Sequence, residues 1–209
     1  SMRKLTMASP RQVANLIRSV GQGAIMSKVD QQSAYKIIGT NPLQWRLQGF
    51  RWLGKYFIEI RLVFGSVSAV MNYDDFGASY TAMIKAMTKT NPNNIPRALD
   101  DQLCITASRE ENERFILTYL QVADKICLPM ADLSDKKKAF LCQTQGTILG
   151  VDFDTSDMTW TLDDEKIQRY MFYLQEAKNK VKCSLKLLQK ILGMINTVTL
   201  LCPILKCYK

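Results

Sequence analysis

The stretch RALDDQLCIT (residues 97–106) decides how this chain folds. Apolar residues stand on both sides of Asp100 and Asp101, a pattern that predicts two short strands meeting at an acidic turn. A third acid, Asp30, follows the strand-like run AIMSKV (24–29). Carboxylates clustered at adjacent strand ends are the hard oxygen ligands that a two-metal Mg²⁺ site needs. An acidic pair taken alone is more often a turn or surface feature, so both interpretations stay open here.

Composition removes several classes of chemistry. The chain has 209 residues, of which 47% are apolar, so it can bury the core of one large domain or two small ones. It contains no histidine, which excludes a Ser-His-Asp triad and a histidine zinc site. The six cysteines form no Cys-x-x-Cys pair, so we expect reduced thiols and an intracellular location, in the nucleus or cytoplasm.

No membrane segment is expected. The longest apolar stretch, residues 185–205, is interrupted by Lys186, Lys190 and Pro203. The first residues lack the apolar run of a signal peptide.

Charge is distributed unevenly along the chain, whose net charge is +9. Residues 1–65 carry ten Lys and Arg against two acids, and residues 166–209 carry nine against one. The middle, 66–165, carries nine against sixteen acids. Two basic ends around an acidic middle are compatible with a polyanion-binding surface near a metal centre. Solvated helix faces are the plainer explanation, which charge alone favours.

Apolar periodicity predicts an α+β domain followed by a pair of helices. Besides the strands above, a β-hairpin is expected around Leu53-Gly54, and the tetrapeptide Tyr73-Asp74-Asp75-Phe76 is placed on a helix surface. The expected helices cover 9–20, 66–89, 110–126, from Thr161 to about 181 and from Ser184 to about 201, with strands within 140–153.

Five stretches, in order, resemble reverse transcriptases, and most closely those of DIRS-type tyrosine-recombinase retroelements. KVDQQSAYKI (28–37) is similar to the first catalytic motif of that family, and ALDDQLCIT (98–106) falls where it has Tyr-x-Asp-Asp. The other three are similar to the Phe-Gly turn region (40–69), the lysine loop and primer-grip hairpin (124–155) and the thumb (162–198). The match covers nearly the whole chain, from about residue 8 to 203.

The resemblance implies a right-hand polymerase architecture. Residues 1–155 would form the palm, an antiparallel sheet with helices on one face, together with partial fingers. Residues 156–209 would form a thumb-like helical subdomain. The family's triphosphate-binding fingers segment is expected upstream of residue 8 and its RNase H region beyond the thumb. We therefore expect truncated fingers, in a piece of a polymerase or in a domain reused by its host.

The resemblance also implies roles for individual residues. Asp30, Asp100 and Asp101 would bind Mg²⁺ or Mn²⁺, and Lys136 (or Lys137) would protonate the leaving pyrophosphate. Tyr35 would screen the nucleotide 2′-hydroxyl. Template and nucleotide would meet Phe64, Gly65, Ser68 and Ala69, and the primer would meet Leu149 and Gly150. Without the resemblance, Tyr35 is equally compatible with a core position, and Lys136–Lys138 with a solvated charge run.

Several departures leave two functional hypotheses. Val63 and Val70 replace the family's prolines, and Ala98 stands where it has tyrosine. The first hypothesis is an RNA-directed DNA polymerase that binds a template-primer, of RNA or DNA, and a deoxynucleoside triphosphate, and that is inactive as an isolated chain. The second is a domesticated, non-catalytic module that binds a protein or nucleic acid.

Overall fold

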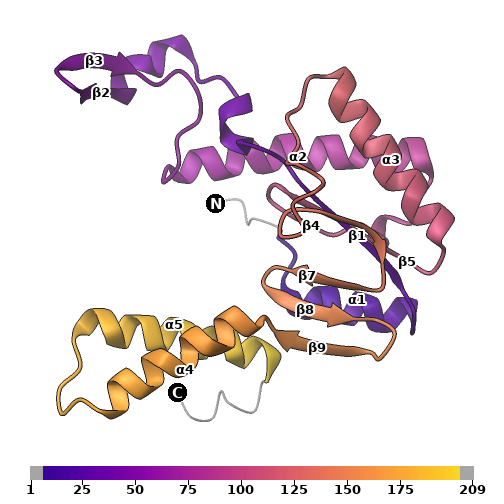
Figure 1. Cartoon of the computed structure of the whole chain (residues 1–209). Coiled ribbons are helices and arrows are strands. Elements are labelled where there is room, and N and C mark those ends of the chain that lie inside the picture. Colours follow the sequence, from indigo (N-terminus) through magenta and orange to yellow (C-terminus); the bar gives the residue numbers. More distant parts are fainter. Residues whose placement is uncertain (1–6, 203–209) are drawn as a thin grey trace, which may run out of the picture. The chain divides into compact units, whose positions relative to one another are not determined.

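The computed structural model describes residues 7–202, which form two compact units (Figure 1). The first contains residue 8 and residues 25–143, and the second contains residues 9–24 and those from 144 onward. Each has an antiparallel sheet and helices, so the expected α+β class is confirmed. In this division the strands from 145 onward belong with the C-terminal helices, and the palm–thumb boundary expected at residue 155 stays a prediction.

The sheet of the first unit has the order β4-β5-β1-β6. Its strands are β1 (Ile25–Asp30), β4 (Arg97–Ala98), β5 (Asp101–Thr106) and β6 (Phe140–Gln143). In the central pair, β1 and β5 run antiparallel, with Asp30 opposite Asp101 and Lys28 opposite Leu103. Side chains alternate between the two faces of a sheet. Lys28, Asp30 and Asp101 therefore share one face, and Val29 lies on the other.

Helices α2 (Val67–Thr88) and α3 (Arg109–Lys125) pack on the face that carries Val29. Tyr80 of α2 and Phe115 of α3 share a buried cluster with Val29 and Cys104. The buried Asn112 amide donates to the carbonyl oxygens of Ile25 and Cys104 at 2.9 and 3.1 Å. These bonds attach α3 to both central strands, so the sheet and its helices form one core.

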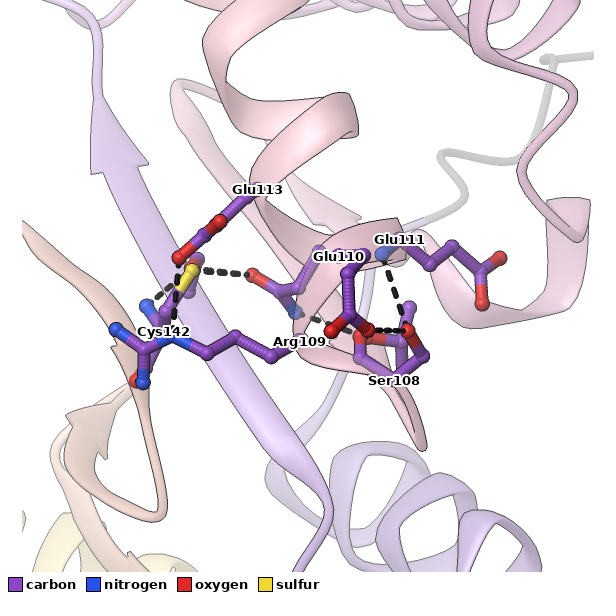
Figure 2. A network of polar contacts seen from close by, with 9 residues as sticks. Ser108, Arg109, Glu110, Glu111, Glu113 and Cys142 are labelled. Atoms are coloured by element: carbon purple, nitrogen blue, oxygen red, sulfur yellow. Dashed lines mark hydrogen bonds and ion pairs between the residues drawn. The ribbon is translucent and has the colours of Figure 1, made fainter.

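The first turn of α3 is held by its own side chains (Figure 2). The Ser108 hydroxyl caps the helix by accepting from the backbone N–H of Glu111 at 3.3 Å. Arg109 pairs with Glu113 and also donates to the carbonyl oxygen of Cys142 in β6 at 3.2 Å. The start of the helix is thereby linked to the edge of the sheet.

A separate hairpin follows two short 3₁₀ segments, η1 (Ala34–Ile37) and η2 (Pro42–Gln48). Strands β2 (Gly49–Trp52) and β3 (Lys55–Ile58) are joined by Leu53 and Gly54, both with positive φ. This is the two-residue turn typical of hairpins, and it confirms the hairpin expected from the sequence. A third 3₁₀ turn, η3 (Pro92–Asn94), leads into β4.

The second unit combines residues 9–24 with residues 144–202. Its elements are α1 (Pro10–Val20), the sheet β7 (Gln145–Ile148), β8 (Val151–Asp154) and β9 (Thr159–Leu162), and the helices α4 (Asp164–Lys178) and α5 (Leu185–Leu201). α1 packs against α5, and the Thr155 hydroxyl donates to the carbonyl oxygen of Ala24 at 2.7 Å. In the described part of the chain, no helix is long and apolar enough to cross a membrane.

The expected helix start at Thr161 is wrong. Thr161 pairs with Asp152 as part of β9, and the helix begins at Asp164 with Asp163 as its cap. The Asp163 carboxylate accepts from the backbone N–H of Glu165 at 2.8 Å. The sequence did not predict β9 because its four residues are too few for a clear alternation of apolar and polar side chains. Their pairing with β8 makes them a strand.

Candidate functional site: an acidic turn beside strand β1

The β4–β5 connection places the acidic pair at a tight turn. Ala98 pairs with Asp101, so Leu99 and Asp100 form a two-residue loop, with Leu99 at a φ of 55°. Asp101 begins β5 directly opposite Asp30, and the backbone N–H of Gln31 donates to the carbonyl oxygen of Asp100 at 3.2 Å. The three acids singled out in the sequence therefore gather at one end of the β1–β5 pair.

Two lysines offset part of the cluster's negative charge. The Lys138 ammonium lies 2.5 Å from the Asp30 carboxylate, whose side chain is 6% exposed. The Lys28 ammonium is 3.7 Å from Asp101 and donates to the carbonyl oxygen of Lys137 at 3.1 Å. Lys136, one of the two loop lysines that the resemblance implied, is exposed, and Lys138 of the same loop pairs with Asp30. Lys138 directly precedes the buried Ala139 and strand β6, which pairs with β1 and brings the lysine to Asp30.

Burial and mutual repulsion change the acids' proton affinity. Burial raises the pKa of Asp101 to about 6; the Lys28 ammonium opposes this effect, and the charges of Asp30 and Asp100 add to it. Burial likewise raises the pKa of Asp100. The hydrogen bond to Asp30 raises the pKa of Lys138. The carboxylates therefore repel one another, and the lysines relieve that repulsion.

This arrangement does not provide a ready metal site. Three carboxylates are suitable hard ligands for Mg²⁺ or Mn²⁺. Between residues 7 and 202, however, no three acidic, cysteine or histidine side chains lie close enough together to hold one ion. An ammonium group occupies the place beside Asp30 that a cation would take. As arranged, Asp30 and Asp101 pair with lysines, and metal binding by the three acids stays a prediction.

The residues expected to meet the nucleotide divide between core and surface. Tyr35, in η1, is 9% exposed, and its ring packs edge-on against Phe64 and Tyr73 with centroids 4.7 and 5.4 Å apart. Burial raises the pKa of Tyr35, and the charge of Asp100 adds to this effect. Ala69 is buried in the same cluster. These contacts give Tyr35 and Ala69 a packing role, while the nucleotide role stays a prediction.

Phe64, Gly65 and Ser68 lie at the exposed start of α2. Phe64 is 73% exposed, and Gly65 has a φ of 90°, where a side chain would be strained. The Ser68 hydroxyl lies 2.8 Å from that of Ser66. These three residues are exposed, and their roles toward template and nucleotide stay predictions.

Leu149 and Gly150 form the β7–β8 turn in the second unit. Both have positive φ, and the Lys166 ammonium donates to the carbonyl oxygen of Gly150 at 2.8 Å. A Cβ at Gly150 would come within 1.5 Å of that ammonium, so glycine is needed for this contact. The acids belong to the first unit, and a primer-grip role for this turn stays a prediction.

The sequence did not predict the contacts that hold the acidic turn against α2, which we call the Asp74–Arg97 clamp. Tyr73 and Asp74 were expected on a helix surface, but Tyr73 is fully buried and Asp74 is 7% exposed. Asp74 pairs with Arg97, whose guanidinium also donates to the carbonyl oxygen of Leu99 at 2.9 Å. Tyr73 donates to the Gln31 side chain. The surface assignment is wrong because this face of α2 turns toward β4 and the end of β1.

Comparisons with known structures define the fold. Foamy virus protease–reverse transcriptase bound to an RNA/DNA hybrid matches with a TM-score of 0.64 and 17% identity, over 93% of this chain and 23% of that one. The same enzyme bound to double-stranded DNA matches at 0.59 and 20%, over 92% and 31%. Telomerase from Candida tropicalis matches at 0.54 and 10%, over 76% and 41%.

The chain therefore has a reverse-transcriptase-like fold, and it spans less than half the length of each of these proteins. No family model and no curated protein sequence matches it.

Proposed function

We propose that this chain is a reverse-transcriptase-like domain derived from the polymerase of a DIRS-type retroelement. The observation that carries the proposal is the gathering of Asp30, Asp100 and Asp101 at one sheet end in this fold. In this lineage a primer 3′-hydroxyl attacks a deoxynucleoside triphosphate and releases pyrophosphate. Mg²⁺ or Mn²⁺, bound by the three acids, would supply activation of that hydroxyl and stabilisation of the leaving group.

The proposed partners are a template-primer and a deoxynucleoside triphosphate. The solved relatives hold an RNA/DNA hybrid or double-stranded DNA. The α4–α5 region, the proposed thumb, exposes Lys178, Lys182, Lys186 and Lys190, which can contact phosphates. Binding through such contacts weakens steeply with salt, because each contact releases counterions.

We further propose that the isolated chain does not polymerise. The Lys138 ammonium lies on Asp30, so a metal ion would have to displace it. The same ion pairs favour the second candidate function, a domesticated, non-catalytic module that binds protein or nucleic acid. They offset the charges of Asp30 and Asp101 without any metal.

Primer extension tests this proposal. The chain and its Asp100→Asn, Asp101→Asn variant are incubated with Mn²⁺, a labelled primer on RNA or DNA template and all four deoxynucleotides. We expect both proteins to bind the template-primer and neither to extend it. Extension by the unmodified chain that disappears in the variant would show an active polymerase and contradict the proposed inactivity. Failure of both to bind at low salt would contradict the nucleic-acid function.

A further inference from the structure

The β2–β3 hairpin exposes aromatic side chains on both of its faces. All eight strand residues are exposed, and Trp52 and Tyr56 are 64% and 83% exposed. In Figure 1 the hairpin projects from α2 and from the sheet of its own unit. An isolated two-stranded hairpin is at best marginally stable in water unless a further strand or another surface packs against it. A binding partner would supply that packing surface.

The pairing assigns side chains to the two faces. Phe50 lies opposite Phe57 and Trp52 opposite Lys55, so three rings and one ammonium share a face. The Phe50 and Phe57 rings are stacked, with centroids 5.5 Å apart and planes 19° from parallel. On the other face, the Arg51 guanidinium lies 5.7 Å from the centre of the Tyr56 ring. Each face therefore combines flat rings with a cation.

Charge indicates which partner fits. Residues 41–61 contain Arg46, Arg51, Lys55 and Arg61 against a single acid, Glu59, which pairs with Lys36. A second copy of this chain would bring the same positive charge to the contact and would be repelled. The positive charge attracts a polyanion. Only a polyanion that carries unpaired aromatic rings could also stack on the exposed aromatic side chains.

We propose that the β2–β3 hairpin is a binding site for single-stranded nucleic acid. Bases stack on Phe50, Trp52 and Phe57, and a phosphate pairs with Lys55 on the same face. Aromatic platforms interleaved with cations bind single strands in this way, and DNA and RNA share that chemistry. The inference rests on the proposed nucleic-acid function and adds a single-strand contact that uses none of the three acids.

Fluorescence anisotropy with labelled 12-nucleotide probes tests the site. The probes are oligo-dT, oligo-U and a DNA strand of equal charge made of abasic units. We expect the chain to bind both base-carrying strands at least tenfold more tightly than the abasic strand. Trp52→Ala with Phe57→Ala should remove that preference, because base stacking on these rings then no longer adds to the affinity of the base-carrying strands. Trp52→Phe with Phe57→Tyr keeps both rings and should retain the preference even if the alanine pair unfolds the hairpin.

Two further kinds of variant are tested: a control outside the hairpin, and variants that remove positive charge from it. Met171→Ala with Phe172→Ala removes two exposed apolar side chains of α4 and should leave the preference unchanged. Lys55→Gln should reduce the magnitude of the slope of log affinity against log salt by about 0.7, the effect of one phosphate contact on a single strand, and Arg51→Gln, on the other face, should reduce it by less. Whether oligo-dT or oligo-U binds more tightly identifies DNA or RNA as the ligand.

Two results would overturn the proposal. One is equal affinity for the abasic and base-carrying strands. The other is a change of oligomeric state, rather than of strand binding, in the Trp52→Ala, Phe57→Ala variant, which would show a protein interface. The Asp100→Asn, Asp101→Asn variant should bind single strands normally, so failure at the hairpin and failure at the acids are distinguishable.

Discussion

At the scale of single residues, Asp30 depends on Lys138 for its charge balance. Asp30 is buried, the Lys138 side chain is 54% exposed, and its ammonium lies 2.5 Å from the Asp30 carboxylate. Lys138→Gln should lower the free energy of unfolding by about 1–2 kcal/mol, because a buried carboxylate then loses its counter-charge and solvent screens only part of that loss. Lys136→Gln, at an exposed neighbour, should change it by less than about 0.5 kcal/mol. Urea unfolding measures both; equal effects would contradict the ion pair.

At the scale of elements, the contact between α2 and the acidic turn of β4–β5 requires the glycine at position 77. A Cβ on Gly77 would lie 2.7 Å from Nη1 of Arg97, which is held by Asp74 and by the carbonyl oxygen of Leu99. Gly77→Ala should therefore destabilise by about 1–2 kcal/mol, although alanine favours helices. Gly193→Ala in α5 meets nothing within 4 Å and should stabilise by about 0.5–1 kcal/mol. Thermal unfolding of both variants checks the prediction. If both substitutions stabilised the protein, close packing of Gly77 against Arg97 would be excluded.

Elements with short-range signals could be predicted from the sequence, and contacts between distant segments could not. Pro10 and the stripe of apolar residues behind it marked α1, and Leu53-Gly54 marked the hairpin turn. Asp100 and Asp101 were found because they interrupt an apolar run. The Lys138–Asp30 pair joins residues 108 positions apart, and no local pattern encodes it. For the same reason Asp74 was misplaced: its partner, Arg97, lies 23 positions away on another element.

At the scale of the whole molecule, the second unit needs a helix from the N-terminal part of the chain. Ile17 of α1 is 5% exposed, and α1 packs against α5. Ile17→Ala should destabilise this unit by about 2–4 kcal/mol, because it leaves a cavity. Hydrogen exchange should then speed up in α5 and β8 more than in α3 and β5. Asn15→Ala, on the exposed side of α1, is the control, and equal loss of protection in both units would contradict the division.

The central claim is that the three acids form the remnant of a metal site in which lysines now pair with Asp30 and Asp101. The measurement that tests it most directly is the melting temperature with and without Mn²⁺, for the unmodified chain and for Lys138→Gln, Asp100→Asn and Asp157→Asn. A cation that binds only the folded state raises this temperature. We predict a small rise for the unmodified chain and for Asp157→Asn, an exposed acid outside the cluster, a larger rise for Lys138→Gln and none for Asp100→Asn. A rise that is absent from all four proteins, or that survives Asp100→Asn, would contradict the claim.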